Sequence, residues 1–380
     1  MNQCQGAGLI IAKAFLQVIL LLLRTIDGIK ARIIYALNAT GGHTKLVFEE
    51  YEGSLDRPTD IRRAVVIALY PNENNMPFTI NLMKGFTNAG FFVLGVSAKI
   101  LPMHMREQLS ANCHHIIERS NVGHDFGSYQ AGVFWIQQQS FYTSLDTLAI
   151  ANDSMFYGAS ITGIINDILC LPGEWFGLFA NYYMGLHVQS FFEIFHKSVL
   201  QSEAFRSFWA KYKPLSSRVH TICKGEVGLS SALLKAGFNP SVLYSGEVVK
   251  RAVISRLSTD PHDMDVLHAL VLKVDEKKPT PFVLGVYPPI HVLTKEIGRI
   301  AENCNPTHSF GLLCNTLFEA PIKCDLAFRG TATIADILTC AKGYSDKELE
   351  AMRRLLHCKG IPASISKISW TALKKKAGIV

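Results

Sequence analysis

The stretch Asn121-Val-Gly-His-Asp-Phe-Gly-Ser-Tyr-Gln-Ala-Gly132 decides the class of fold that this chain can adopt. It leads into a helical pattern, and the next apolar segment, Ala149-Ile-Ala-Asn-Asp-Ser154, ends abruptly in polar residues. A glycine-rich turn that feeds a helix offers backbone N–H groups and the positive end of the helix to an anion. A carboxylate at the tip of a nearby strand lies where open α/β sheets bind their ligands. The two stretches predict an α/β fold with a site for a phosphate-bearing ligand, with or without a metal ion.

Strands and helices alternate around this stretch, from residue 63 to residue 151. The apolar patterns predict strands over 63–70, 91–97, 115–118 and 145–151, and helices over 78–90, 105–111 and 128–139. Such alternation is typical of a mostly parallel sheet with helices on both faces.

The chain divides into three expected regions: a helical segment over 1–40, an α/β domain over 60–250 and a mainly helical region over 251–380. Within the second region we predict a strand over 175–179 and helices over 188–200, 204–212 and 231–236. In the third, residues 273–281 form a polar, proline-bearing break and residues 345–356 an amphipathic helix.

Composition restricts the class of protein. Charged residues make up 18% and hydrophobic residues 48% of the 380 positions, which excludes a disordered chain. The net charge of +7 suits anionic partners such as nucleotides or phospholipid headgroups, and we expect no nucleic acid among them. The nine cysteines include no CxxC pair and are odd in number, which argues against a disulfide framework and a structural zinc site and favours a cytoplasmic protein.

The amino-terminal segment is apolar from Ala7 to Leu23, which is short for a spanning helix of roughly 20 residues. On a helical wheel Lys13, Gln17, Arg24 and Asp27 share one narrow arc. This pattern predicts an amphipathic helix in a membrane interface, with its basic residues near the headgroups. A helix buried against the α/β domain is the alternative interpretation.

Several segments, in this order, resemble the rhamnan synthesis protein F family of bacterial surface polysaccharide assembly. Over roughly residues 60–330 they are Val65–Leu69, Arg119–Gly132, Asn152–Ser154, His187–Phe192, Gly225–Ser230, Asn305–His308 and Pro321–Lys323. The resemblance implies a GT-A-like fold with a Rossmann-type, mostly parallel sheet.

The resemblance also implies an activity. It suggests an inverting glycosyltransferase that moves a hexose, such as rhamnose or another deoxyhexose, from a nucleotide sugar. The acceptor would be a growing surface polysaccharide, such as the O-antigen of lipopolysaccharide, or another lipid-linked glycan. The expected location is peripheral, on the inner face of the cytoplasmic membrane.

The donor half of the expected site combines the glycine block with the strand that ends in Asn-Asp-Ser. Asp153 is the expected ligand of a divalent cation, Mg²⁺ or Mn²⁺, since such ions bridge a carboxylate and ligand phosphates. Ser154 supplies no second carboxylate, which places the need for a metal in question, and the three residues could instead cap a helix. The expected donor-binding residues are Asn121, Gly123, Asp125, Gly127, Asn152, Asp153 and Ser154.

The acceptor half of the expected site contains Glu226 and His187. The acceptor hydroxyl must lose its proton, and we expect Glu226, at a strand-to-helix junction, to be the base. His187 precedes an apolar helical pattern and would contact the diphosphate or the acceptor. The structural alternatives are a helix-dipole carboxylate for Glu226 and a buried hydrogen-bonded ring for His187. A non-catalytic GT-A-like protein that binds or scaffolds carbohydrate is the alternative function.

Overall fold

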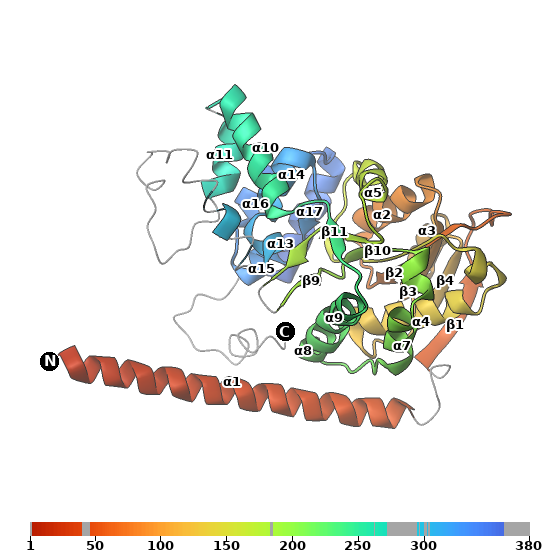
Figure 1. Cartoon of the computed structure of the whole chain (residues 1–380), viewed down its shortest axis with the longest axis horizontal. Coiled ribbons are helices and arrows are strands. Elements are labelled where there is room, and N and C mark those ends of the chain that lie inside the picture. Colours follow the sequence, from red (N-terminus) through yellow and green to blue (C-terminus); the bar gives the residue numbers. More distant parts are fainter. Residues whose placement is uncertain are drawn as a thin grey trace.

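The computed structural model describes residues 2–39, 46–182, 185–261, 263–271 and 305–360, together with 295, 297–299 and 302. The expected break at 273–281 lies outside the described residues. The chain folds around one eight-stranded sheet with helices on both faces (Figure 1). The α/β class with a large, mostly parallel sheet, which the strand–helix alternation predicts, is therefore confirmed.

The strands of the central sheet form a parallel core that antiparallel strands extend. Neighbours pair in parallel from β4 through β3 and β2 to β5, whereas β1 and β10 join in the antiparallel sense. The order across the sheet is β1 (Val47–Glu52), β4 (His115–Arg119), β3 (Phe92–Ser97), β2 (Arg63–Leu69), β5 (Thr147–Asn152), β10 (Phe192–His196), β7 (Trp175–Gly177) and β11 (Pro240–Val242).

The inner strands are apolar on both faces because a helical layer covers each face. In β2, Val65 and Ile67 belong to one core cluster, and Ala64 and Val66 to the other. The first face is covered by α2 (Met76–Asn88), α3 (Met103–Ser110) and α5 (Ile161–Leu169), and the second by α4 (His124–Gln137), α6 (Lys197–Gln201), α7 (Glu203–Lys211) and α9 (Val227–Lys235).

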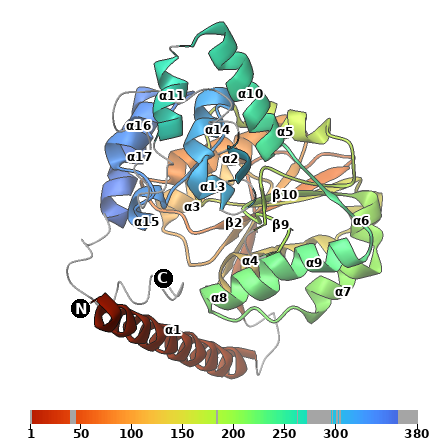
Figure 2. The ribbon, with the colours of Figure 1, turned by 60° about the vertical axis from the view of Figure 1, so that its left-hand side comes forward.

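The carboxyl-terminal helices lie together beside the sheet (Figure 2). They are α10 (Gly246–Thr259), α11 (Met264–Val271), α13 (Pro306–Ser309), α14 (Gly311–Phe318), α15 (Leu326–Arg329), α16 (Ile334–Cys340) and α17 (Asp346–Lys359). All of them except α13 contribute residues to the first core cluster. A small antiparallel sheet connects this region to the end of β5, because β12 (Ile322–Lys323) pairs with β6 (Met155–Phe156). This pairing brings residues of the carboxyl-terminal region to the expected donor site.

Two helix predictions need correction. The helix predicted over 188–200 is wrong: β9 (His187–Val188), the buried strand β10 and the short α6 occupy this segment. The short run Phe191-Phe-Glu-Ile-Phe195 has no distinctive period, and pairing with both β5 and β7 makes β10 an inner strand. The helix predicted from residue 128 begins earlier, at His124, so most of the glycine block is helical.

The strand-to-helix junction predicted at Glu226 is also wrong. Helical structure runs without interruption through α8 (Arg218–His220), a π-helical turn over Thr221–Glu226 and α9. Glu226 is therefore the last residue of the π turn. Such turns are rare and occur often at functional sites.

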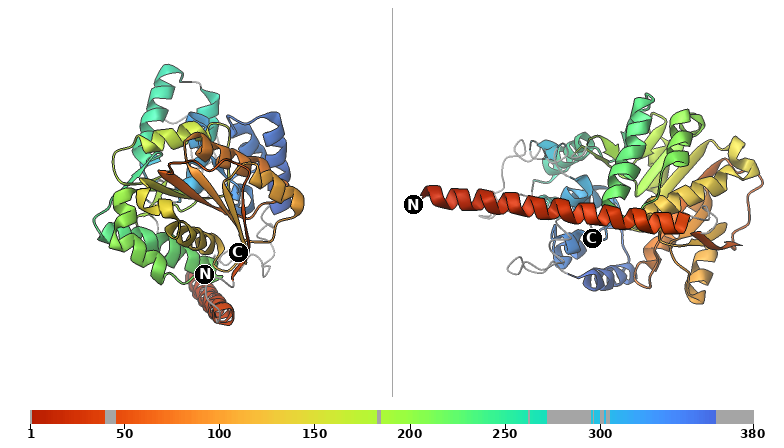
Figure 3. Two further views of the ribbon diagram at one scale, coloured as in Figure 1. Left: turned by 90° about the vertical axis from the view of Figure 1, so that its right-hand side faces the viewer. Right: turned by 90° about the horizontal axis from the view of Figure 1, so that it is seen from below.

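The amino-terminal segment forms one long helix, α1 (Asn2–Ala39), which runs along one side of the α/β body (Figure 3). Ala31 on its inner side is 1% exposed, whereas Ile26 and Ile33 on its outer side are 62% and 55% exposed. The helix therefore contacts the body and also presents apolar side chains outward. Among the described residues, no helix has both the length and the apolar character needed to cross a membrane.

Candidate functional site

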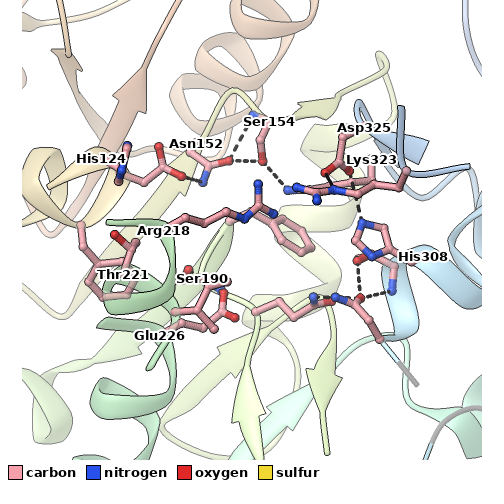
Figure 4. Close-up of a pocket in the computed structure, with 18 of the residues that line it drawn as sticks. His124, Asn152, Ser154, Ser190, Arg218, Thr221, Glu226, His308, Lys323 and Asp325 are labelled. Carbon is pink, nitrogen blue, oxygen red and sulfur yellow. Dashed lines mark hydrogen bonds and ion pairs between the residues drawn. The ribbon is translucent and has the colours of Figure 1, made fainter. Parts of the chain in front are cut away.

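A pocket of about 590 Å³ opens where β4 and β5 end and the carboxyl-terminal region meets the sheet (Figure 4). Its size lies within the range of roughly 300–1,000 Å³ that is usual for small-molecule sites. Polar side chains from the α/β body and from the carboxyl-terminal region line it: Asp125, Asn152, Ser154, Ser190, Arg218, Glu226, His308, Lys323, Asp325 and Arg329 are among them. The pocket lies at the carboxyl ends of the parallel strands, as expected.

The glycine block contributes one carboxylate to the pocket and uses its glycines for packing. Asp125 faces the pocket, and the surrounding protein raises the pKa of its carboxyl group by desolvation. Gly123 has φ +85° and donates its N–H to Ser216 Oγ at 3.2 Å. A Cβ at Gly127 would lie 2.1 Å from the carbonyl oxygen of Val122. Asn121, Gly123 and Gly127 do not line the pocket; Asn121 is exposed elsewhere.

The Asn152-Asp153-Ser154 segment divides between the pocket and the sheet edge. Asn152 donates to Asp125 Oδ2 at 3.0 Å and accepts from the backbone N–H of Ser154 at 3.1 Å. Asp153 does not line the pocket: its Oδ2 accepts the N–H of Tyr70 at 2.8 Å and Nδ2 of Asn75 at 3.2 Å. Burial raises the pKa of Asp153 to about 6. The structure thus brings Asp125, Asn152 and Ser154 together and turns Asp153 away.

Glu226 and His187 form a pair on the opposite wall. His187 Nε2 lies 3.3 Å from Glu226 Oε1, and Glu226 Oε2 accepts the N–H and Oγ of Ser190 at 2.9 and 2.8 Å. The other His187 nitrogen contacts the Gly185 carbonyl at 2.8 Å. Glu226 lines the pocket, but His187 is 1% exposed and does not. His187 therefore reaches a ligand only through Glu226.

The two members of this pair shift each other's pKa. Burial opposes ionisation of Glu226. The hydrogen bond and the charge of His187, together with the hydrogen bonds of Ser190, nevertheless bring the pKa of Glu226 below the usual value. Burial likewise lowers the pKa of His187, yet the hydrogen bond and charge of Glu226 raise it above 6.5 overall. The pair therefore favours an ionised carboxylate beside a protonated ring.

The pocket also contains cations from two segments that are distant in sequence. Lys323 Nζ donates to Ser154 Oγ at 2.7 Å and lies 5.2 Å from the centroid of the Phe191 ring. Figure 4 shows Arg218 directed into the pocket between Asn152 and Ser190. Lys323 lies in a segment that resembles the family, whereas no spacing in the sequence indicates Arg218.

A further carboxylate in the pocket is already paired. Asp325 accepts from Arg329 Nε at 2.9 Å and lies 3.2 Å from His308 Nε2. Burial would raise the pKa of Asp325, but His308, Lys323 and Arg329 together hold it well below the usual range. No sequence pattern singled out Asp325 or Arg329: the two pair at a separation of four residues, but their place in the pocket depends on the pairing of β12 with β6.

Comparison with known families agrees with the motif order. Residues 93–262 match the family model of rhamnan synthesis protein F. The resemblance to this family is therefore confirmed over that part of the chain. Arg218 and Glu226 lie inside the matched region, whereas Lys323, Asp325 and Arg329 lie beyond it.

Individual relatives are distant. The uncharacterized protein y4gN of Sinorhizobium fredii (strain NBRC 101917 / NGR234) is 29% identical over 168 residues, which is 43% of each chain. The chain thus matches less than half the length of this curated relative.

Two solved structures show weak similarity. The glycosyltransferase GlyE of Streptococcus pneumoniae TIGR4 is 12% identical, with a TM-score of 0.32 over 65% of each chain. The WbbM bifunctional glycosyltransferase in its apo form is 12% identical, with a TM-score of 0.30 over 51% of this chain and 40% of that one. Scores this low do not establish a common fold.

Proposed function

We propose that this chain is a glycosyltransferase that holds a nucleotide sugar in the pocket and transfers the sugar to a glycan or lipid-linked acceptor. The observation that carries the proposal is that one pocket holds an anchored carboxylate, Glu226, together with the cationic side chains Arg218 and Lys323. The family match over residues 93–262 supports a role in surface polysaccharide synthesis, with rhamnose or another deoxyhexose as the donor sugar.

The chemistry needs charge of both signs. An acceptor oxygen attacks the anomeric carbon while the bond from that carbon to the diphosphate breaks, which inverts the configuration in a single step. Negative charge grows on the diphosphate, where cations placed in advance stabilise it. Glu226 takes the proton of the acceptor hydroxyl, and its lowered pKa keeps it ionised at neutral pH. His187 and Ser190 position this carboxylate.

An assay of nucleotide release tests the activity. The full chain is incubated with a panel of nucleotide sugars and lipid-linked acceptors, and the released nucleoside diphosphate is measured. We expect Glu226→Gln to lose at least about a hundredfold in turnover, as is typical for a general base, while the donor still binds. Equal turnover in this variant would refute the role of Glu226. Donor binding without release from any member of the panel would favour the non-catalytic carbohydrate-binding alternative, which the turned-away Asp153 supports.

We further propose that α1 lies on the inner face of the cytoplasmic membrane. Its outward side carries large apolar residues at helical spacing, each more than half exposed, and the exposed cations Arg24, Lys30 and Arg32 lie on the same helix. Apolar burial and attraction to anionic headgroups act together in such helices. The exposed apolar residues are Phe15, Val18, Leu21, Leu22, Ile26, Ile29, Ile33 and Leu37.

Co-sedimentation with lipid vesicles tests this placement. The double variant Ile29→Asp/Ile33→Asp should lose binding to anionic vesicles. Ile100→Asp is the matched control, because Ile100 is a similarly exposed residue, at 63%, outside α1. Equal binding by the double variant and the wild type would contradict the proposal.

A further inference from the structure

The residues around Asn152-Asp153-Ser154 do not fit the divalent cation that the sequence suggested. A metal-binding carboxylate must be ionised and directed at the ion. Asp153 instead uses Oδ2 for Tyr70 and Asn75, has its pKa raised to about 6 by burial, and does not line the pocket. In the described part of the chain, no three His, Cys, Asp or Glu side chains gather to hold a metal ion.

An ammonium group lies beside the Asn152-Asp153-Ser154 segment. Lys323 Nζ contacts Ser154 Oγ at 2.7 Å, directly beside Asp153 in sequence. The backbone holds this contact in place, because Lys323 pairs with Met155 across β12 and β6, and Cys324 N–H donates to the Ser154 carbonyl at 3.1 Å. The position of the ammonium is thus built into the small sheet.

The guanidinium of Arg218 supplies a second cation to the same space. Its side chain is half-buried and directed into the pocket (Figure 4). Unlike Arg329, which pairs with Asp325, Arg218 has no ion pair with any carboxylate of the described residues. A guanidinium presents several N–H donors in a planar fork that matches phosphate oxygens.

The two cations are electrostatic neighbours. Burial is the main cause that lowers the pKa of Lys323, and the charge of Arg218 lowers it further, although Asp325 and Asp125 oppose this effect. Of the carboxylates lining the pocket, Glu226 and Asp325 are held in ion pairs with other groups. An anion between Arg218 and Lys323 would relieve their repulsion, whereas a divalent cation would increase it.

We propose that Arg218 and Lys323, in place of a divalent cation, neutralise the diphosphate of the donor in this pocket. This inference rests on the proposed function, because it assumes a donor that carries a diphosphate. It also places one of the two cations of the diphosphate site, Lys323, in the carboxyl-terminal region, beyond residues 93–262 that match the family.

Calorimetric titration of the full chain with UDP, GDP and dTDP tests the proposal, once in EDTA and once with Mg²⁺ or Mn²⁺. At least one nucleoside diphosphate should bind, with affinities in the two buffers that agree within about twofold. Lys323→Met and Arg218→Met should each weaken binding in EDTA by at least tenfold, which corresponds to about 1.4 kcal/mol. Lys323→Arg should restore part of the loss.

Matched controls distinguish the loss of a cation in the pocket from the loss of positive net charge. Lys211→Met and Arg251→Met remove the same charges from exposed positions outside the pocket and should leave binding unchanged. Melting temperatures of all variants identify any that do not fold, and Lys323→Gln then replaces Lys323→Met.

Each contrary result has a distinct meaning. Binding that requires Mg²⁺ or Mn²⁺ would overturn the inference and leave the proposed function intact. Metal-free binding that neither pocket variant weakens would overturn the assignment of these two residues. The absence of binding by every nucleoside diphosphate in both buffers would overturn the proposed function itself.

Discussion

Replacing Gly127 with alanine should destabilise the protein although alanine is the better helix former. Gly127 lies in the first turn of α4. Its added Cβ would lie 2.1 Å from the Val122 carbonyl oxygen and 2.8 Å from Nη1 of Arg119. These neighbours hold each other, because Arg119 Nη2 donates to the same carbonyl at 2.9 Å and the guanidinium is buried.

The magnitude follows from three contributions. Overpacking in a close-packed region costs about 1–3 kcal/mol. Disturbing a buried hydrogen bond from a charged donor costs about 1.5–3 kcal/mol. The gain in helix propensity returns about 1 kcal/mol. The net expectation for Gly127→Ala is a loss of about 1.5–5 kcal/mol in the free energy of unfolding.

Gly163→Ala is the matched control. Gly163 lies in α5, is exposed, and has no atom within 4 Å of an added Cβ. This variant should gain about 0.5–1 kcal/mol. Urea denaturation followed by far-ultraviolet circular dichroism measures both variants. If Gly127→Ala matches or exceeds the stability of the wild type, the contact with Val122 is not rigid and the reasoning fails.

Two further predictions concern buried titratable groups. In Glu226→Gln the pKa of His187, measured by NMR, should fall from above 6.5 to below it, because burial then acts on the ring without the opposing carboxylate; an unchanged value would contradict the pairing. Burial raises the pKa of Glu193 well above 4.5 in the folded protein. The folded state therefore favours the protonated carboxyl group, and this contribution to the free energy of unfolding is lost as the pH rises from 4.5 toward the pKa in the folded protein. Glu193→Gln retains an acceptor for Trp175 Nε1, which donates at 2.7 Å, and should gain stability relative to the wild type as the pH rises over that range; a pH-independent difference between the two would refute this account.

The sequence predicts the elements whose patterns are local. β2 is a run of apolar residues that both helical layers bury, and the helix predicted over 345–356 begins with a capping box between Ser345 and Glu348. β10 could not be recognised, because five residues without a clear period become a strand only through pairing on both sides. Local pattern and tertiary context agree in the first two cases and conflict in the third.

The candidate site likewise contains residues that can be recognised in the sequence and residues that only the folded chain positions. Asp125, Asn152 and Glu226 belong to motifs that can be recognised in sequence, and all three line the pocket. The orientation of Asp153 could not be predicted, because it depends on hydrogen bonds from Tyr70 and Asn75. The position of Arg218 depends likewise on the course of a helix that the sequence did not indicate there.

The pairing of β12 with β6 has a consequence for the order in which the protein becomes active during its synthesis. All strands of the large sheet lie within the first 242 residues, but Ser154 meets Lys323 across a separation of 169 residues. Lys323 follows the last strand of the large sheet by 81 residues (from 242 to 323), which a ribosome at about 5–20 residues per second synthesises in roughly 4–16 seconds. A nascent chain can therefore complete its sheet well before it holds both cations, so the diphosphate site is among the last parts of the molecule to form.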